Sequence, residues 1–334
     1  MKAVVLEGPG LISVKDVPEP VGKDGWAIIR IKAAGICGSD VNAYKGKGQV
    51  LHYPLILGHE VSGEIVECST RSGFVPGDRV MVEPYLPCGS CYACSLGRTN
   101  CCEQLRVLGV QTDGAMSEYI LHPEGLLHRL PGSVSFVNAT VAEPLTIAMH
   151  GIHRIGLKTG EHVAIIGAGT IGILSALYVL YKGGVPILID PLEKRLAVGK
   201  GLGVPHTVDP VDAEDAVRSI TGGRGAEVVL EISGSLEGVK NTVRLASYCG
   251  RVSLTGWPSA DPEFNTAMVT RKELTIYGSR NSAREFPEAL DLIAGDIIDI
   301  KPLISKVVPF DELPGVIESI AENPTSTIKV IGKM

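Results

Sequence analysis

The sequence is poor in aromatic residues, has no excess of basic charge and contains no long apolar run. Phe, Trp and Tyr make up 5% of the 334 residues, and the formal net charge is -6. A chain without a basic patch lacks the electrostatic surface that nucleic acids and anionic membranes require, so neither is expected as a partner. No apolar run approaches the roughly 18 residues that span a bilayer, and residues 1–10 lack the features of a signal peptide. We therefore expect a cytoplasmic protein.

Hydrophobic residues, by contrast, are plentiful, and so are cysteines. The hydrophobic content is 45%, and the length suits two domains of roughly 100 to 200 residues each. Because disulfides are rare in the cytoplasm, the eight cysteines indicate metal binding or catalysis.

A glycine-rich motif, GAGTIG at residues 167–172, follows a short apolar run. In G-x-G-x-x-G spacing the first glycine permits a tight turn, the second lets the backbone approach a pyrophosphate, and the third lets the helix pack on the strand. The helix N-terminus then offers free N–H groups to phosphates. Alone, this spacing also occurs in ordinary turns. The residues expected to bind a dinucleotide here are Gly167, Gly169, Thr170, Ile171 and Gly172.

The context of this motif strengthens the prediction. A second apolar strand is expected over residues 185–189, and it ends in Asp190. An acid at this offset binds a ribose 2'-hydroxyl and repels a 2'-phosphate, which favours NAD over NADP. The alternative for Asp190 is a helix cap before Pro191.

Four cysteines lie within fifteen positions in a loop rich in Gly and Ser. Four thiolates at this spacing predict a closed tetrahedral zinc site of the structural kind, with disulfide pairing as the rival interpretation. From the sequence alone Cys101 competes with its neighbour for the fourth place. The expected ligands are Cys88, Cys91, Cys94 and Cys102.

Three further polar positions interrupt apolar surroundings. Cys37 stands in GICGSD, His59 in LGHE, and Glu143 beside a proline in VAEPLTIAMHGI. Taken singly, the cysteine could be a small core residue and the histidine a satisfied loop residue. A carboxylate in an apolar stretch has to be solvated, paired or metal-bound, because an unpaired buried charge is very costly.

The order of the expected elements indicates an α/β protein with two domains. Short strands dominate up to about residue 130, a helical pattern covers 137–153, and strands and helices then alternate as in a doubly wound parallel sheet. Elements after residue 280 are expected to return to the first domain. The predicted domains are 1–146 with 279–334, and 147–278.

Taken together, these motifs resemble the zinc-containing medium-chain dehydrogenase/reductase superfamily. The resemblance rests, in chain order, on Cys37-Gly-Ser-Asp, Gly58-His-Glu, the four-cysteine loop, PGDRV at 76–80, Glu143-Pro-Leu and GAGTIG. It implies a GroES-like β-rich catalytic domain interrupted by a Rossmann domain, and a homo-oligomer, either dimer or tetramer. Glu143-Pro-Leu is similar to the sorbitol and threonine dehydrogenase branch. Residues 97–103 and 278–281 look most like sugar-acid dehydrogenases of the L-galactonate 5-dehydrogenase type.

The resemblance also implies the site and its chemistry. A catalytic zinc would be held by Cys37 and His59, with Glu60 and Glu143 as a direct or water-mediated acidic shell and a fourth position left for water or substrate. It selects Cys102 for the structural zinc, which makes two zinc ions per chain. The implied reaction moves a hydride from a polar secondary alcohol, such as L-galactonate or a polyol, to NAD. Ser39 matches the position that first relays the hydroxyl proton.

One position, Asn42, departs from the family pattern. Many relatives continue the relay through a histidine where this chain has Asn42, which cannot titrate. Proton exit must then use water, the cofactor ribose or another group such as His52, although His52 is equally explained as a surface loop residue. Arg195 could reach the adenosine ribose or lie on a solvated helix face.

Two other functions compete with the leading one. The first is oxidation of a sorbitol-type polyol or of L-threonine at C3. The second is a non-catalytic NAD-binding regulatory protein. The joint presence of Cys37, His59 and Glu143 argues against the second, because a binding-only protein has no need of an open metal site.

Overall fold

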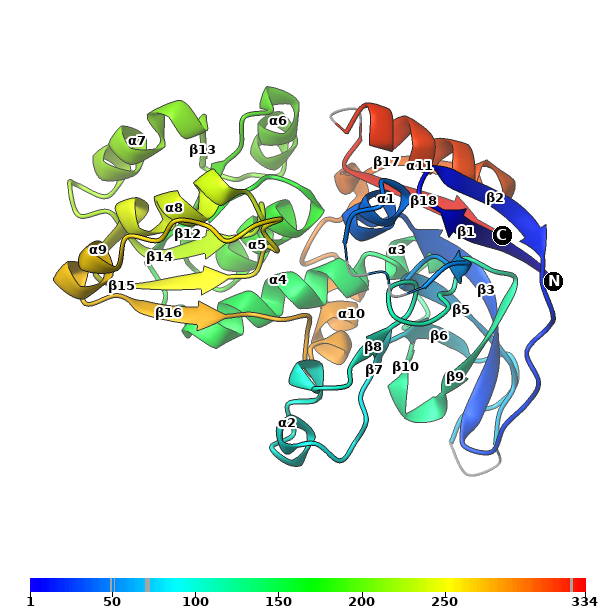
Figure 1. The fold of residues 1–334 in the computed structure, drawn as a ribbon. Coiled ribbons are helices and arrows are strands. Elements are labelled where there is room, and N and C mark those ends of the chain that lie inside the picture. Colours follow the sequence, from blue (N-terminus) through cyan, green and yellow to red (C-terminus); the bar gives the residue numbers. More distant parts are fainter. Residues whose placement is uncertain (49, 51, 70–72, 325–326) are drawn as a thin grey trace. The chain divides into compact units, whose positions relative to one another are not determined.

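The computed structural model describes residues 1–48, 50, 52–69, 73–324 and 327–334, which form two compact units (Figure 1). The first unit comprises Met1–Glu143, Phe286–Asp296 and Ile304–Met334, and the second comprises Pro144–Glu285 and Ile297–Leu303. The predicted boundaries after residues 146 and 278 stay a prediction. Among the described residues no helix is long and apolar enough to cross a membrane.

Antiparallel strands build most of the first unit. Its main sheet has the order β10-β6-β5-β3-β18-β17, with β9 also pairing with β3, and smaller sheets have the orders β2-β1-β4 and β7-β8. The strands are β1 Lys2–Gly8, β2 Leu11–Asp16, β3 Trp26–Gly35, β4 Leu55–Ile56, β5 Glu60–Glu67, β6 Arg79–Val82, β7 Tyr85–Leu86, β8 Arg106–Val107, β9 Tyr119–Pro123, β10 Leu127–Arg129, β17 Ile304–Pro309 and β18 Lys329–Lys333.

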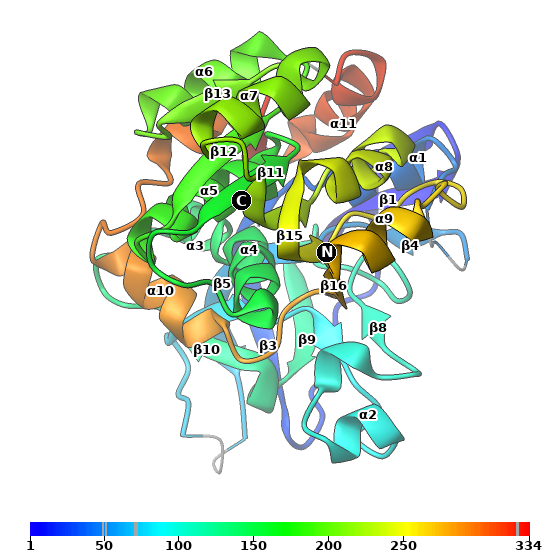
Figure 2. The same ribbon diagram turned by 90° about the vertical axis from the view of Figure 1, so that its left-hand side faces the viewer.

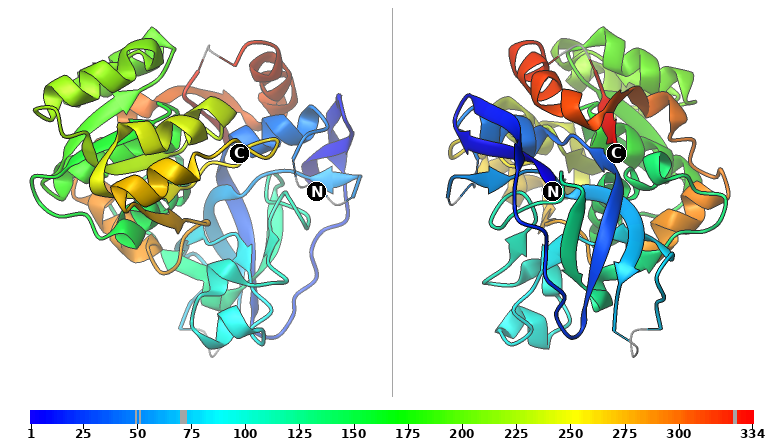
Figure 3. Two further views of the ribbon diagram at one scale, coloured as in Figure 1. Left: turned by 60° about the vertical axis from the view of Figure 1, so that its left-hand side comes forward. Right: turned by 90° about the vertical axis from the view of Figure 1, so that its right-hand side faces the viewer.

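Short helices complete this unit. They are α1 Gly38–Tyr44, α2 Tyr92–Ser95, α3 Phe136–Ala139, α10 Phe286–Ala294 and α11 Leu313–Glu322, and α4 Ala142–Ile155 begins in it. The carboxyl-terminal strand β18 pairs antiparallel with β3, so the red end of the chain lies among the blue strands (Figure 3). Apolar side chains from β3, β5, β6, α11 and β18 share one buried core.

A parallel sheet forms the centre of the second unit. Its order is β13-β12-β11-β14-β15-β16, and α4 and α5 lie on one face while α8 and α9 lie on the other (Figure 2). This arrangement confirms the predicted doubly wound sheet. The strands are β11 His162–Ile166, β12 Val185–Ile189, β13 His206–Val208, β14 Ala226–Glu231, β15 Ala246–Leu254 and β16 Thr275–Gly278, and the helices are α5 Thr170–Tyr181, α6 Glu193–Gly201, α7 Ala213–Ile220, α8 Leu236–Leu245 and α9 Thr266–Lys272.

Some elements of the structure have no clear signal in the sequence. Strand β13 has three residues, which are too few for a recognisable apolar period. Helix α9 is stabilised by contacts distant in sequence, because the Lys272 ammonium donates to the carbonyls of Val243, Arg244 and Ala246. The polar break around Cys37 is the start of a helix, α1.

One glycine fixes the backbone immediately before the predicted zinc ligand His59. Gly58 has a φ of 98°, which is disfavoured for residues with a Cβ. A Cβ at this position would lie 2.5 Å from Cγ and 2.9 Å from the amide nitrogen of Met116. Conformation and space therefore both require glycine here.

We expect Gly58→Ala to destabilise the fold more than a matched change elsewhere. Gly77 has a similar φ of 94°, but a Cβ on it would meet no heavy atom within 4 Å, so Gly77→Ala reports backbone strain alone. That strain should lower the free energy of unfolding by about 1–2 kcal/mol. Overpacking against Met116 should cost Gly58→Ala about 1–3 kcal/mol more in urea unfolding. Equal losses in the two variants would contradict the steric argument.

Candidate metal and cofactor sites

Three predicted ligands converge in the first unit. One ligand atom from each of Cys37, His59 and Glu60 lies within 4.8 Å of the other two. Cys37 caps the N-terminus of α1, His59 follows Gly58, and Glu60 is the first residue of β5. The histidine and the glutamate are buried, whereas the cysteine is partly exposed. A thiol, an imidazole and a carboxylate at this separation suit a zinc ion with one position open.

Asp40 orients this cluster, and the sequence analysis assigned it no role. Its Oδ2 accepts a hydrogen bond of 2.8 Å from the Cys37 amide, and its Oδ1 lies 3.9 Å from His59 Nδ1. Neither Oδ1 nor Nδ1 has a hydrogen-bond partner among the described residues. On the other side of the ring, Nε2 lies 3.3 Å from Ser39 Oγ. Carboxylates that contact the second nitrogen of a metal-binding histidine typically fix its ring orientation. The only sequence signal was the acid three residues after Cys37.

A buried lysine holds Glu60. Lys329 Nζ lies 2.7 Å and 2.5 Å from the two carboxylate oxygens of Glu60 and also donates to the Ile36 carbonyl at 3.0 Å. Both side chains are almost completely buried, and the negative charge of Glu60 helps to raise the pKa of Lys329 although burial lowers it. This contact spans 269 residues, so no local pattern could reveal it.

Glu143 lies in the first turn of α4. The Tyr85 hydroxyl donates a hydrogen bond to Glu143 Oε1. Burial raises the pKa of Glu143 to about 7, partly against the opposing effect of His59. Of the described residues, only Cys37, His59 and Glu60 meet the 4.8 Å separation in this cluster, so Glu143 lies farther out.

The electrostatic field of this cluster favours a cation. Burial by itself lowers the pKa of His59, but Cys37, Asp40 and Glu143 together raise it well above its usual value. Burial likewise raises the pKa of Asp40. Buried carboxylates stabilise a positive charge placed among them. A bound metal ion would supply such a charge.

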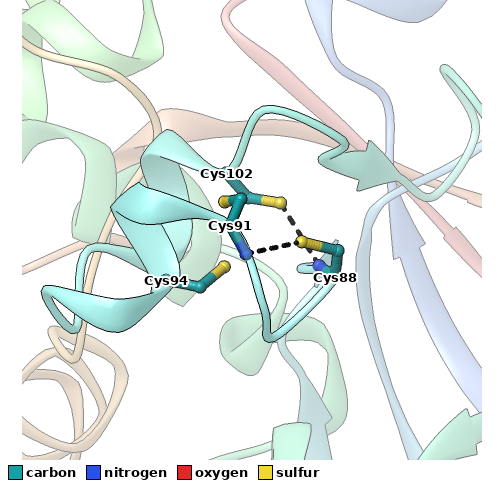
Figure 4. A group of neighbouring side chains, drawn as sticks. All are labelled: Cys88, Cys91, Cys94 and Cys102. Carbon is teal, nitrogen blue, oxygen red and sulfur yellow. Dashed lines mark hydrogen bonds between the residues drawn. The ribbon is translucent and has the colours of Figure 1, made fainter.

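The four predicted cysteines of the loop also come together (Figure 4). The sulfurs of Cys88, Cys91, Cys94 and Cys102 all lie within 4.8 Å of one another. Backbone N–H groups point at two of them, since the Cys91 amide lies 3.4 Å from the Cys88 sulfur and the Cys88 amide 3.2 Å from the Cys102 sulfur. Cys101 is exposed and outside the cluster, and all eight cysteines are free thiols.

The pKa values of two of these thiols are shifted by their surroundings. Hydrogen bonds from the backbone of Ser90 and Cys91 lower the pKa of Cys88 to about 6. Loss of hydration and the neighbouring thiols raise the pKa of Cys94 to about 12. Adjacent thiolates repel one another, so all four ionise together only when a cation lies among them.

The glycine motif in the second unit has the geometry that the sequence predicted for it. Gly167 has a φ of 108° directly after β11, and Gly169 is the N-cap of α5, whose first residues are Thr170 and Ile171. A Cβ on Gly172 would lie 1.8 Å from the Gly167 carbonyl oxygen. The helix therefore starts directly against the turn, and a helix N-terminus so placed is suited to bind phosphate groups.

Asp190 connects this turn to the next one. It follows β12, and its Oδ2 accepts a 2.7 Å hydrogen bond from the Ala168 amide while Oδ1 accepts one of 2.9 Å from Leu192. Arg195 Nη1 lies 3.8 Å from the same carboxylate. The bond from Leu192 corresponds to the turn-capping alternative considered from the sequence, and ribose binding by Asp190 stays a prediction.

Asn42 and its possible substitute in the relay, His52, both lie on the surface. Asn42 is exposed on α1, and His52 is exposed with Nδ1 3.3 Å from the Pro54 carbonyl oxygen. This placement favours a surface role for His52.

Comparison with known proteins identifies both units. The family described as "Alcohol dehydrogenase GroES-like domain" matches residues 23–132, and "Zinc-binding dehydrogenase" matches residues 170–295.

Full-length relatives and solved structures agree. The chain is 46% identical to an uncharacterized zinc-type alcohol dehydrogenase-like protein of Haemophilus influenzae. The match covers 99% of this chain and 98% of the relative. It is 33% identical to L-galactonate-5-dehydrogenase of Escherichia coli, with 98% of each chain covered, and 30% identical to sorbitol dehydrogenase of Bacillus subtilis, with 99% and 96% covered.

Among solved structures, a putative zinc-binding dehydrogenase of Sinorhizobium meliloti bound to NADP has a TM-score of 0.92 at 32% identity, covering 100% of this chain and 99% of that one. The RspB alcohol dehydrogenase of Escherichia coli complexed with NADH also has a TM-score of 0.92, at 29% identity, with 100% and 99% covered. The chain is an oxidoreductase that belongs to the zinc-type medium-chain alcohol dehydrogenase family.

Proposed function

We propose that this protein oxidises a polar secondary alcohol, either a sugar acid such as L-galactonate or a polyol, and passes the hydride to NAD. The observation that carries the proposal is the cluster of Cys37, His59 and Glu60 within 4.8 Å, surrounded by buried acids. A thiolate, an imidazole and a carboxylate leave one position for a substrate oxygen, which is the arrangement of a catalytic zinc.

Cys37 and His59 would hold this zinc, with Glu60 or Glu143 as the carboxylate. Lys329 already contacts both oxygens of Glu60, which restrains that side chain. The loop of Cys88, Cys91, Cys94 and Cys102 would hold a second, structural zinc, because four thiolates leave no open position. When bound, the catalytic zinc supplies Lewis-acid activation that lowers the pKa of an alcohol hydroxyl.

Ser39 would accept the proton of the substrate hydroxyl. Its Oγ lies 3.3 Å from His59 Nε2, and a hydroxyl can accept one proton while donating its own. Asn42 is exposed and has no titratable group, so the proton would leave through water or the cofactor ribose.

The second unit would bind NAD through its glycine turn, and the nicotinamide supplies the hydride acceptor. Asp190 at the end of β12 supports NAD, since a carboxylate there repels a 2'-phosphate. Arg195 lies next to it and would reach the adenosine ribose. The solved relatives named above bind NADH in one case and NADP in the other, so the support comes from Asp190.

Relatives support a polar substrate. Those named L-galactonate-5-dehydrogenase and sorbitol dehydrogenase act on hydroxylated carbon chains, and the low aromatic content of this chain fits a polar site. Sorbitol-type polyols are the second candidate, and L-threonine is a third that rests on the Glu143-Pro-Leu motif. A homo-oligomer, dimer or tetramer, stays a prediction.

Zinc content tests both metal sites separately. By mass spectrometry we expect about two zinc ions per chain in the native protein and about one in either Cys37→Ala or Cys94→Ala, because each variant removes one ligand set. Cys101→Ala is the matched control, since this exposed thiol lies outside the cluster, and it should retain both ions. Loss of zinc from Cys101→Ala, or an unchanged content in Cys94→Ala, would contradict the assignment.

Substrate and cofactor are tested by reduction of the nicotinamide with aldonates including L-galactonate, polyols including sorbitol, and L-threonine. We expect turnover with one class of sugar acid or polyol, and a kcat/KM for NAD at least about 100-fold above that for NADP, because like charges brought together cost several kcal/mol. Cys37→Ala should lose turnover while binding NADH as the native protein does. Turnover with L-threonine alone, or a preference for NADP, would overturn the corresponding part of the proposal.

A further inference from the structure

A buried carboxylate lies at the carboxyl end of the parallel strands, where the dinucleotide site is proposed. Glu231 is the last residue of β14 and is fully buried. It stands in register with Ile166, the residue before the glycine motif, and with Leu254 at the end of β15. Burial raises the pKa of Glu231 above its usual value. Burying an acid here costs free energy unless hydrogen bonds compensate for its lost hydration.

The side chain of Glu231 fixes the loop that follows β14. Its Oε1 accepts hydrogen bonds from the Ser233 hydroxyl at 2.5 Å and from the Gly234 amide at 3.0 Å. Ser233 Oγ in turn lies 2.9 Å from Ser235 Oγ, which caps the first turn of α8 by accepting from the Gly238 amide. The acid therefore determines the path of the chain from the strand into the helix.

The same residue fixes the loop that follows β15. The Glu231 carbonyl accepts hydrogen bonds from the Thr255 amide at 2.9 Å and the Gly256 amide at 3.0 Å. A Cβ on Gly256 would lie 2.4 Å from both Glu231 Oε2 and the Gly234 amide nitrogen. The 232–235 loop thus bonds to the carboxylate of Glu231 and the 255–256 loop to its backbone carbonyl, and the close packing excludes any side chain at Gly256.

These two loops occupy the half of the sheet opposite Asp190. The strand order β13-β12-β11-β14-β15-β16 reverses between β11 and β14, and dinucleotides bind across the carboxyl ends of the strands at such a point. Asp190 follows β12 on the adenosine side. The other mononucleotide half therefore lies over β14 and β15. Ser233 also touches the pyrophosphate turn, because a Cβ on Gly167 would lie 3.0 Å from its amide nitrogen.

We propose that Glu231 is a positioning residue for the nicotinamide half of the cofactor. Its carboxylate holds the 232–235 loop, against which the 255–256 loop packs, at the geometry in which the two loops receive the nicotinamide mononucleotide, and it does so without touching the reacting atoms. The inference rests on the proposed dinucleotide function of this unit. It adds a residue outside the glycine motif and the ribose-binding acid.

Calorimetric titration with NADH and with ADP-ribose, which lacks the nicotinamide, separates this role from general stability. Glu231→Ala should weaken NADH binding about tenfold or more, since hydrogen bonds to a carboxylate are lost, and change ADP-ribose binding less than about twofold. Glu231→Gln retains an acceptor at Oε1 and should restore NADH affinity to within about threefold of the native value.

Glu227→Ala is the matched control. Glu227 lies on the same strand near its amino end and also accepts a backbone hydrogen bond, from the His162 amide at 2.8 Å. This variant should bind both ligands like the native protein. If Glu231→Ala does not fold, Gly256→Ala drives the loops apart sterically and should show the same selective loss for NADH.

The outcomes are distinct. Equal weakening of NADH and ADP-ribose in the Glu231 or Gly256 variants, or no weakening of either, would overturn the positioning role. Native protein that binds neither ligand would instead overturn the proposed dinucleotide function, on which the inference depends.

Discussion

The burial of several ionisable groups at one point is the constraint on which the β-rich unit depends. Asp40, Glu60, Glu143 and His59 are all buried there, and Lys329 forms an ion pair with Glu60. Buried charges are tolerated when they are paired or coordinate a metal, so three carboxyl groups gathered at one buried point favour a bound cation. The elements α1, β5 and β18 are held together by contacts to this cluster, which couples the fold to its chemistry.

The parallel-sheet unit also has buried carboxylates, and they lie at the carboxyl ends of its strands. Asp190 accepts amides from two turns, and Glu231 accepts hydrogen bonds from the loop after its own strand. In both cases a buried carboxylate satisfies backbone N–H groups that would otherwise lack partners. The loops are thereby fixed before a ligand arrives, which lowers the ordering cost of binding.

Sequence reasoning succeeded where the determining contacts are local. Strand β12 has the predicted bounds 185–189, because its apolar run is clear and it ends at Asp190 before a proline. The four-cysteine cluster and the glycine turn also depend on neighbours in the chain. Lys329 could not be predicted as a partner of Glu60, nor Tyr85 as a partner of Glu143, because tertiary packing alone brings these pairs together across 269 and 58 residues.

The central claim is that the Cys37, His59 and Glu60 cluster holds a zinc ion. Anomalous diffraction above and below the zinc absorption edge, on crystals of the protein purified with zinc, tests it directly. We expect one anomalous peak among the four loop cysteines and a second one bonded to Cys37 and His59. A filled cysteine loop beside an empty Cys37 and His59 cluster would contradict it, because the first site shows that zinc was available.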